Sequence, residues 1–242
     1  MTGREPPEGA LSAVDAPGAG RHDGREALLL LSGGIDSSTL LVELMQGGCN
    51  VTALTFDYGQ RHRREVDAAR RFCALHVVAD HVVIGLDLHL GRASTLLGGG
   101  PPVAKYAGEV PGGPVDSYVP ARNLVFLSHA AAVAEARGVG RVLVGFNADD
   151  AVNYWDCSRE FVERINDLLR LSGRGAVQVE APYLTMSKGE VVVRSRRLGV
   201  DLSALVSCYD PTDGAECGAC LACRRRREAV RLADAERVEP VG

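Results

Sequence analysis

From Glu26 onward the chain alternates short apolar runs with longer amphipathic segments, and this alternation constrains the fold more than any other feature. Short apolar runs are typical of buried parallel strands, whereas apolar residues three and four positions apart are typical of helices packed on a sheet. Strands are predicted over Ala27–Leu31, Val51–Phe56, His81–Ile84, Arg141–Gly145 and Val177–Ala181. The pattern therefore predicts an α/β fold, in which a five-stranded parallel sheet is flanked by helices. The predicted helices are Ser37–Gln46, Arg61–His76, Leu124–Ala136 and a segment after Ser158.

The composition divides the chain into three parts. Residues 1–25 are rich in Pro and Gly with almost no large apolar side chains, so they are predicted to be a disordered tail. Residues 26–197 are predicted to form the α/β domain, and residues 198–242 a small helical module that carries a cysteine cluster. The Gly- and Pro-rich segment Leu86–Asp116 is predicted to be a long loop, which serves as a lid, a partner-binding segment or a disordered connection.

The charge balance excludes a strongly basic nucleic-acid binder. With 27 Lys+Arg against 31 Asp+Glu the formal net charge is −4, so we expect no stable nucleic-acid partner. No apolar run approaches the roughly 18 residues that a membrane span requires. The N-terminus also lacks the charged-then-apolar layout of a secretory signal. We therefore expect a cytoplasmic protein in reducing surroundings, with no membrane partner.

Four of the seven cysteines are spaced Cys-x8-Cys-x2-Cys-x2-Cys near the C-terminus. An odd total in a reducing compartment argues against a disulfide framework. Zn²⁺ binds four thiolates in a closed, structural, tetrahedral site and favours CxxC pairs. An iron–sulfur cluster is the main alternative, although the closing Cys-Pro of ferredoxins is missing, and four unrelated free thiols are another. The predicted zinc ligands are Cys208, Cys217, Cys220 and Cys223.

A Gly-rich turn joins the first predicted strand to the first predicted helix. Gly33 and Gly34 let the backbone come close to an anion, and free N–H groups and the helix dipole converge at the same place. The turn lacks the Gly-Lys-Ser/Thr ending of a Walker-A loop and the GxGxxG dinucleotide pattern. The sequence therefore predicts a phosphate site of another type, with a plain serine-capped connection as the alternative.

The segment Ser32–Ser37, which reads SGGIDS, resembles the SGGxDS loop of the ATP pyrophosphatase (PP-loop) superfamily, whose fold is Rossmann-like and of the adenine-nucleotide alpha-hydrolase type. In that superfamily the loop holds the β,γ-pyrophosphate of ATP while a substrate oxygen attacks the α-phosphate. The resemblance implies that ATP and Mg²⁺ bind and that Asp36 lies near the magnesium–pyrophosphate. The implied ATP-binding residues are Leu31, Ser32, Gly33, Gly34, Ile35, Asp36, Ser37, Ser38 and Thr39.

Further segments, in order over roughly residues 27–227, resemble the 7-cyano-7-deazaguanine synthase family of queuosine-pathway deazapurine biosynthesis. They are Ser32–Ser37, Phe56–His62, Val119–Asn123, Asp150, Tyr154, Asp156–Cys157, Glu160–Phe161, Ser187–Glu190 and Ser207–Tyr209 with the CxxCxxC. The resemblance implies an ATP-dependent carbon–nitrogen ligase that forms a homodimer. The carboxyl of 7-carboxy-7-deazaguanine is adenylated, ammonia converts it to an amide, and a second adenylation expels the amide oxygen to leave a nitrile.

The implied reaction assigns roles to named side chains. Stabilising the departing pyrophosphate requires cations, for which Lys188 and Arg122 are the candidates beside Asp36, and His62 is the candidate for proton transfer. A guanine-like edge presents N–H donors that a carboxylate accepts in pairs. The expected substrate-binding residues, which converge where strands end, are Tyr58, Gln60, Arg61, Asn123, Asp150, Tyr154 and Asp156. Solvated helix starts and turns are the structural alternative for these polar residues.

The chain also departs from the family pattern. The family's Gly-Tyr-Pro-Asp-Cys-Arg is Asn153–Ser158 here, an aromatic residue is replaced by Ala151, and the Leu-Arg pair after the last cysteine is Arg225-Arg226. A related ligase that stops at the amide of a similar deazapurine acid is therefore one alternative. A PP-loop enzyme that modifies tRNA is a second, with Arg224–Arg227 as a phosphate-binding run rather than a solvated helix face. A non-catalytic nucleotide-binding protein is a third.

Overall fold

The computed structural model describes residues 25–61, 63–108, 112–172, 177–212 and 215–235. The predicted tail up to residue 24 and the candidate proton-transfer residue His62 lie outside the described residues, as do residues 236–242 of the predicted module. Within the part of the chain that the structure describes, no helix combines the length and apolar character needed to cross a membrane.

A five-stranded sheet with the strand order β3-β2-β1-β4-β5 forms the centre of the molecule, and every neighbouring pair is parallel. The prediction of a parallel five-stranded sheet is thus confirmed. Central β1 pairs on one side with β2, as in Ala27↔Val51, and on the other with β4, as in Leu28↔Val142. The strands are β1 Glu26–Leu30, β2 Asn50–Asp57, β3 Asp80–Gly85, β4 Arg141–Leu143 and β5 Gln178–Glu180.

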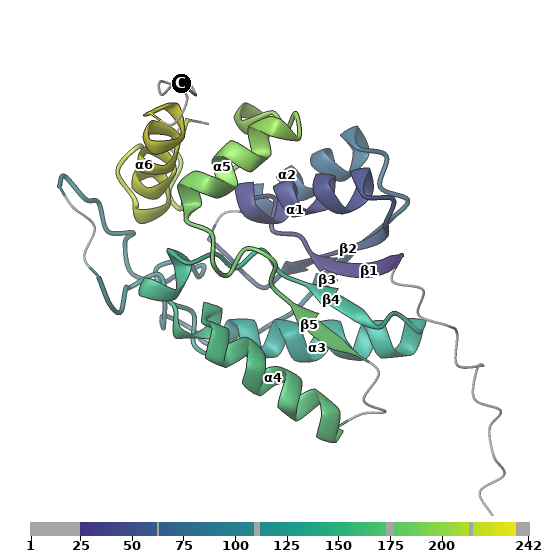
Figure 1. Cartoon of the computed structure of the whole chain (residues 1–242). Coiled ribbons are helices and arrows are strands. Elements are labelled where there is room, and N and C mark those ends of the chain that lie inside the picture. The colour runs from purple at the N-terminus through teal and green to yellow at the C-terminus, as the bar shows by residue number, and fades with distance from the viewer. Residues whose placement is uncertain (1–24, 62, 109–111, 173–176, 213–214, 236–242) are drawn as a thin grey trace, which may run out of the picture.

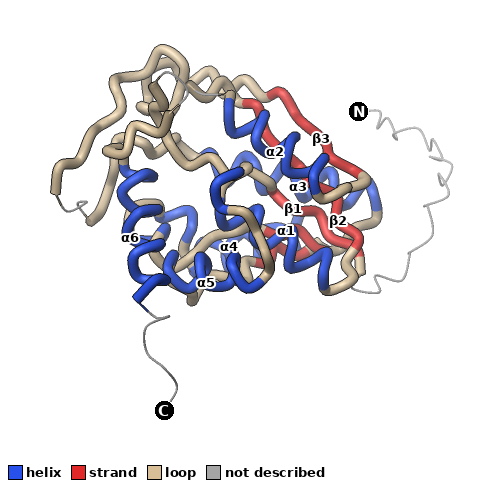
Figure 2. Tube along the Cα trace, turned by 90° about the horizontal axis from the view of Figure 1, so that it is seen from above, coloured by secondary structure: helices blue, strands red, loops and turns tan. Residues whose placement is uncertain are grey.

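Helices cover both faces of this sheet (Figure 1, and from above in Figure 2). One face carries α1 Ile35–Gln46, α2 Arg64–Leu75, α5 Lys188–Arg197 and α6 Leu221–Ala235. The opposite face carries α3 Arg122–Arg137 and α4 Arg159–Ser172. The short helical turns are η1 Asp150–Val152, η2 Trp155–Cys157 and η3 Leu202–Ala204.

The two hydrophobic cores that flank the sheet follow from the alternation of side chains along β1 and the residue after it. Leu29 and Leu31 belong to the cluster that includes α1, α5 and α6, whereas Leu28 belongs to the cluster that includes α3 and α4. Successive side chains of a strand point to opposite faces, so a central strand in a two-sided sheet must be apolar at nearly every position. This requirement explains the unbroken apolar run that marks β1 in the sequence.

The chain changes direction between β1 and β4, and this change creates a crevice. The connection after β1 leads to α1 on one face, and the connection after β4 leads to α4 on the other. Neighbouring strands whose connections diverge leave an opening at their carboxyl ends, which is where open α/β sheets bind ligands. The loop that begins at Ser32 and the segment that begins at Val144 form the two sides of this opening.

Candidate active site

A cavity of about 290 Å³ opens at the carboxyl ends of β1, β2 and β4. Its size is near the lower end of the range for small-molecule sites, about 300–1,000 Å³. One part of its wall is apolar and includes Phe56, Phe126 and Phe146, and another part is polar and includes Asp36, Asp150 and Lys188. The same cavity therefore offers an apolar wall to a flat ring and a polar wall to a charged group.

The Gly-rich loop forms the end of the cavity nearest to α1. Gly33 has φ +78°, and a Cβ there would lie 2.7 Å from the Glu65 carbonyl oxygen, so only glycine fits. Ser32 and Ser37 brace the turn, with 3.0 Å between their hydroxyl oxygens. Gly34 is the N-cap of α1 and gives it no side-chain cap. The first N–H groups of α1 therefore face the cavity edge with the positive end of the helix dipole, as a phosphate group requires.

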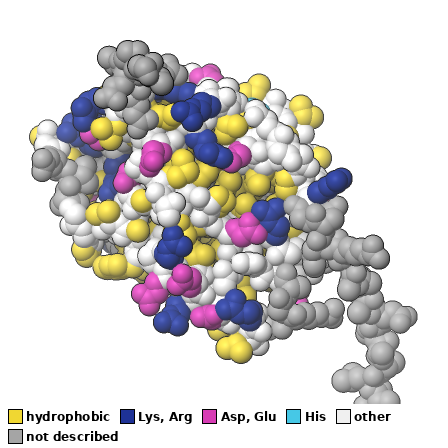
Figure 3. All heavy atoms as spheres, viewed as in Figure 1, with side chains coloured by type: hydrophobic (Ala, Val, Ile, Leu, Met, Phe, Trp, Pro, Cys, Tyr) yellow, Lys and Arg dark blue, Asp and Glu magenta, His cyan; other side chains and the backbone are white. Residues whose placement is uncertain are grey.

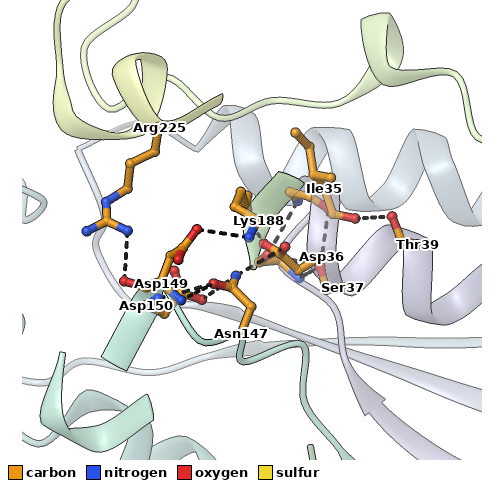
Figure 4. A network of polar contacts seen from close by, with 11 residues as sticks. Ile35, Asp36, Ser37, Thr39, Asn147, Asp149, Asp150, Lys188 and Arg225 are labelled. Carbon is orange, nitrogen blue, oxygen red and sulfur yellow. Dashed lines mark hydrogen bonds and ion pairs between the residues drawn. The ribbon is translucent and has the colours of Figure 1, made fainter. Parts of the chain in front are cut away.

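A buried polar network lies beside this loop (Figure 4). The Lys188 ammonium forms an ion pair with Asp36. Asn147, which is fully buried, donates from its amide nitrogen to Asp36 Oδ1 at 3.3 Å and to Asp150 Oδ2 at 2.8 Å. Its amide oxygen accepts from the backbone N–H of Asp149 at 3.0 Å and of Asp150 at 3.1 Å. Asn147 thus connects the Gly-rich loop to the segment after β4.

Helix α5 presents Lys188 to this network from its first turn. Ser187 caps the helix by accepting from the Glu190 N–H at 3.2 Å, and Glu190 in turn accepts from the Ser187 N–H at 2.7 Å. The Lys188 N–H donates to Asp149 Oδ2 at 2.9 Å. This reciprocal capping fixes the backbone of Lys188, so that its side chain extends to Asp36.

Burial and neighbouring charges shift the titration of the network. Burial raises the pKa of Asp150 to about 6, with the nearby Asp36 charge adding to the effect and Lys188 opposing it. Burial opposes the charged form of Lys188, but Asp36 and Asp150 outweigh it and raise the pKa of that ammonium. Lys188 is therefore a permanent cation at neutral pH, whereas the Asp150 carboxyl, with a pKa of about 6, titrates close to neutrality.

Arg122 supplies a second, half-buried cation on the opposite wall. Its guanidinium donates to the Tyr58 hydroxyl at 3.2 Å and lies 5.8 Å from the centre of the Tyr58 ring. Glu65 also lines the cavity, and burial raises its pKa although Arg122 opposes the shift. Tyr154 extends this wall through a 2.8 Å contact with Ser117 and a 3.4 Å contact with Tyr209, hydroxyl to hydroxyl.

Most of the residues predicted for the site line the cavity. They are Leu31, Ser32, Gly34, Ile35, Asp36, Ser37, Tyr58, Gln60, Arg122, Asn123, Asp150, Tyr154 and Lys188. Gly33, Ser38 and Thr39 are not part of the cavity lining. Ser38 and Thr39 are buried, and Thr39 donates to the Ile35 carbonyl at 2.6 Å. Gln60 also closes the turn after β2, because its side chain accepts from the Tyr58 N–H at 2.8 Å.

Two predicted substrate-binding residues lie outside the cavity lining. Arg61 turns away and donates to the carbonyls of Thr95, Gly100 and Pro101, so it anchors the long loop. Asp156 accepts from the Asn123 N–H at 3.4 Å, at the start of α3. Both arrangements are supporting contacts to the backbone near the site.

Several residues of the site were not among the sequence predictions: one, Asn147, is buried beside the cavity, and four line it. Asn147, Asp149 and Arg225 belong to the polar network, and Glu65 and Tyr209 to the opposite wall. Asn147 and Asp149 follow the fourth predicted strand, so their place after a strand end was a signal available in the sequence. Glu65 had no such signal, because it lies in an amphipathic helix where an acidic residue is ordinary.

The four cysteines of the C-terminal pattern come together beside α6. Their sulfur atoms all lie within 4.8 Å of one another. Four sulfurs about 2.3 Å from one zinc ion would be about 3.8 Å apart, so the cluster fits the ion with little adjustment. Burial opposes ionisation, but N–H donors from Ala219 and Cys220 and the Lys105 ammonium lower the pKa of Cys217 to about 6. The donor set is that of a closed structural site.

Both the sequence and the fold of this chain are similar to those of known proteins. The family model described as queuosine biosynthesis protein QueC matches residues 26–234. The 7-cyano-7-deazaguanine synthase of Ectopseudomonas mendocina is 42% identical over 208 residues, which cover 84% of this chain and 92% of that protein. The corresponding enzyme of Saccharophagus degradans is 41% identical over 218 residues, which cover 88% and 96%.

Among solved structures, NMN synthetase from Francisella tularensis superposes with a TM-score of 0.51 at 18% identity, over 90% of this chain and 79% of that one. At this identity the likeness concerns the fold alone.

Proposed function

The chain belongs to the QueC family, and from this premise we propose that it converts 7-carboxy-7-deazaguanine and ammonia to 7-cyano-7-deazaguanine at the expense of ATP. The observation that carries the proposal is one cavity lined by both the SGGxDS loop and Asp150. An ATP-dependent ligase requires a triphosphate and an acceptor to meet in this way. The family match covers both the loop and the cysteine cluster.

ATP is the proposed cosubstrate, held by the loop from Leu31 to Thr39. The uncapped start of α1 and the Ser32 and Ser37 hydroxyls are suited to the β,γ-pyrophosphate. Mg²⁺, when bound with ATP, would neutralise phosphate charge, and Asp36 is the loop carboxylate that faces that position. Lys188 and Arg122 are the cations that stabilise negative charge as pyrophosphate departs, because both are held inside the cavity.

The reaction requires the same activation twice. Hydroxide and oxide are poor leaving groups, so the substrate carboxylate oxygen first takes the adenylyl group and ammonia then displaces AMP to form the amide. The amide oxygen is adenylated in its turn, and loss of AMP and a proton leaves the nitrile. The chain contributes the orientation of both reactants and fixed cations near the leaving group.

The deazapurine is proposed to lie between the aromatic wall and Asp150. Phe56 and Phe126 stack with centroids 4.1 Å apart and line the cavity, so they offer an apolar wall to a flat ring. The Asp150 carboxylate, when ionised, accepts the paired N–H donors of a guanine-like edge. Asn123, Tyr58 and Tyr154 complete this part of the proposed substrate site.

Zinc is proposed for the four-cysteine cluster, where it would hold the polypeptide on either side of the cluster together. We also propose that the enzyme is a homodimer, that it works in the cytoplasm and that its partners are small molecules. In Figure 3, basic side chains lie beside acidic ones on the visible face, an arrangement that favours a small substrate over a polyanion.

Two departures from the family pattern, at Trp155 and Ser158, lie outside the cavity lining, whereas Arg225, in place of the family's leucine, is part of it. Trp155, in place of the family's proline, is 60% exposed and packs edge-on against Tyr118. Ser158, in place of arginine, accepts from the Phe161 N–H at 3.2 Å in the first turn of α4. Both contacts favour a structural use of the altered residues, and so they support the nitrile-forming reaction over one that stops at the amide.

The test is AMP and pyrophosphate release from ATP by the purified, zinc-loaded protein. We expect release when 7-carboxy-7-deazaguanine and ammonium are both present, and none when the acid is omitted. Absence of AMP from folded protein with both substrates present would contradict the proposal. AMP formed only after addition of bulk tRNA, with salt-sensitive tRNA binding in a gel shift, would support the tRNA-modifying alternative instead.

A further inference from the structure

Glu65 places a carboxylate in the wall of the cavity, and no step of the proposed adenylation depends on it. It lies in the first turn of α2, which packs against the Gly-rich loop. A Cβ on Gly33 would lie 2.7 Å from the Glu65 carbonyl oxygen and 2.9 Å from the Ala69 nitrogen. The Glu65 side chain therefore belongs to the part of the wall next to the loop that is suited to the ATP phosphates.

The Glu65 carboxylate differs from the other carboxylates of the cavity wall in having no polar partner. Within the part of the chain that the structure describes, its oxygens form no hydrogen bond or ion pair, and neither oxygen is closed off from solvent. Asp36, Asp149 and Asp150, in contrast, all accept from nitrogen atoms of the polar network. The Glu65 oxygens are thus free to accept from a donor that enters the cavity.

Aromatic residues and one cation surround this carboxylate. Burial raises the pKa of the Tyr58 and Tyr209 hydroxyls, and the Glu65 charge adds to both shifts, so both rings lie close to it. Arg122 donates to the Tyr58 hydroxyl at 3.2 Å rather than to Glu65. A carboxylate beside aromatic rings favours a small cation as its ligand.

The proposed reaction requires a base at the attacking nitrogen. Ammonium is the dominant form of ammonia at neutral pH, and its nitrogen has no free electron pair until a proton leaves. A carboxylate binds ammonium by accepting from its N–H groups, and it can then take that proton. Burial raises the pKa of Glu65, although Arg122 opposes the shift, so Glu65 is a stronger base than an exposed glutamate.

We propose that Glu65 forms an ammonium-binding site and is the catalytic base that releases ammonia for attack on the adenylated carboxyl. This inference rests on the proposed function. One proton of ammonium passes to a Glu65 oxygen, the freed electron pair bonds to the carbonyl carbon, and AMP leaves with the electron pair of the broken carbon–oxygen bond. A second proton passes from the nitrogen to water, which leaves the amide, and Glu65 then returns its proton to solvent.

The experiment compares Glu65→Gln and Glu65→Asp with the wild-type enzyme. Glutamine keeps the size of the side chain without its charge or basicity, and aspartate keeps the charge on a shorter chain. The control is Glu163→Gln, which changes an exposed glutamate of α4. Each protein is checked for melting temperature and zinc content.

Two assays separate formation of the adenylate from its reaction with ammonia. The first measures exchange of labelled pyrophosphate into ATP, with 7-carboxy-7-deazaguanine present and ammonium absent. The second measures AMP release over a range of ammonium concentrations, at pH 7 and at pH 8.

We expect Glu65→Gln to lower kcat/KM for ammonium by about 100-fold or more, as loss of a general base implies. Pyrophosphate exchange should stay close to that of the wild type, Glu65→Asp should recover part of the rate, and Glu163→Gln should match the wild type throughout. The wild-type kcat/KM for total ammonium should change little from pH 7 to pH 8, because Glu65 takes the proton. The Glu65→Gln value should rise with the fraction of free ammonia.

Two outcomes would overturn the inference while leaving the proposed function intact. One is an equal loss of pyrophosphate exchange and of ammonium use in Glu65→Gln, which would assign Glu65 to formation of the adenylate. The other is a wild-type kcat/KM for ammonium in that variant, or the same pH dependence in both proteins. A wild-type protein that catalyses no exchange with the acid present would overturn the proposed function itself, and this inference with it.

Discussion

Lys188 and the carboxylates around it set the electrostatics of the site at the scale of single residues. Lys188 pairs with Asp36, and Asn147 connects Asp36 to Asp150. Removing one charge from this buried set leaves another unbalanced, which costs much more than loss of an exposed ion pair. The charged state of each member therefore matters for both catalysis and stability.

Asp36→Asn should abolish most of the turnover while the fold persists. The amide keeps the shape and an acceptor for Asn147 but loses the charge that faces Lys188, so we expect kcat to fall about 100-fold or more. Steady-state AMP release and thermal melting measure the two effects. The control is Asp67→Asn, an exposed residue that pairs with Arg70 on α2. Activity within twofold of the wild type would show that Asp36 has no catalytic role.

Asp150 should make the stability of the ligand-free protein depend on pH. Its pKa is about 6 in the folded state against an ordinary value of 3.8, so folding favours the protonated carboxyl. The resulting stabilisation is complete below about pH 4 and is lost as the pH rises through 6, by an amount on the order of 3 kcal/mol in total. The Asp150→Asn variant should not lose stability in this way, because its side-chain amide does not titrate.

Urea unfolding of the wild type and of Asp150→Asn, each at pH 5 and pH 7 without ATP or Mg²⁺, isolates the effect. The free energy of unfolding of the variant minus that of the wild type should be larger at pH 7. Comparing the two proteins at each pH cancels the titration of groups that do not interact with Asp150. An equal difference at both values would mean that Asp150 titrates normally.

The sequence predicted these residues only in part. Asp36 and Lys188 lie in contiguous motifs, and the structure brings them into one ion pair. Asn147 and Arg225 could not be assigned, because their roles depend on contacts across 111 and 72 residues of chain respectively. Arg225 in particular belongs to a run of four arginines that is also typical of a solvated helix face.

At the scale of secondary structure, the segment that directly follows β4 must pack against the start of α1. A Cβ at Gly145 would lie 2.9 Å from the Ser37 nitrogen and 3.0 Å from the Asp36 carbonyl carbon. Both contacts are with backbone atoms, so strand and helix would have to separate. We expect Gly145→Ala to destabilise the protein by about 1–3 kcal/mol and to lower kcat/KM.

Gly85 at the end of β3 offers a matched control for this substitution. A Cβ there meets no described atom within 4 Å, so Gly85→Ala should leave the free energy of unfolding and the activity close to those of the wild type. Equal effects of the two substitutions would mean that the contact between β4 and α1 is not required for the site.

The cysteine cluster should hold one zinc ion per chain. Cys220→Ser replaces a fully buried member, so we expect loss of bound zinc and a lowered melting temperature, since metal binding contributes directly to folding. Elemental analysis and calorimetry measure both. Cys49→Ser, outside the cluster, is the control. Iron and sulfide in place of zinc would favour the alternative of an iron–sulfur cluster.

The elements themselves were largely predictable, and their ends were not. The segment predicted to begin as a helix at Arg61 begins at Arg64, because the Arg61 N–H bonds to the Leu96 carbonyl of the long loop. Strand β4 ends at Leu143 rather than Gly145, since the following residues leave the sheet to line the cavity. In each case the surrounding tertiary structure determines where the element ends. The local pattern of apolar and polar residues does not contain this information.

At the scale of the whole molecule, the site draws on segments that are distant in sequence. The Gly-rich loop follows β1, Asp150 follows β4, Lys188 begins α5 and Arg225 belongs to α6. The parallel sheet and its crevice were predictable from the strand pattern and the rule for open α/β sheets. The contribution of α6 to the cavity was not, because the cysteine pattern indicates a separate module.

The central claim is that this assembly converts a deazapurine acid to a nitrile. Mass spectrometry of the product from 7-carboxy-7-deazaguanine, ammonium and excess ATP tests it most directly, because acid, amide and nitrile differ in mass. We predict that 7-cyano-7-deazaguanine accumulates and that the amide appears only transiently. Accumulation of the amide as the final product, or recovery of unchanged acid from folded zinc-loaded protein, would contradict the claim.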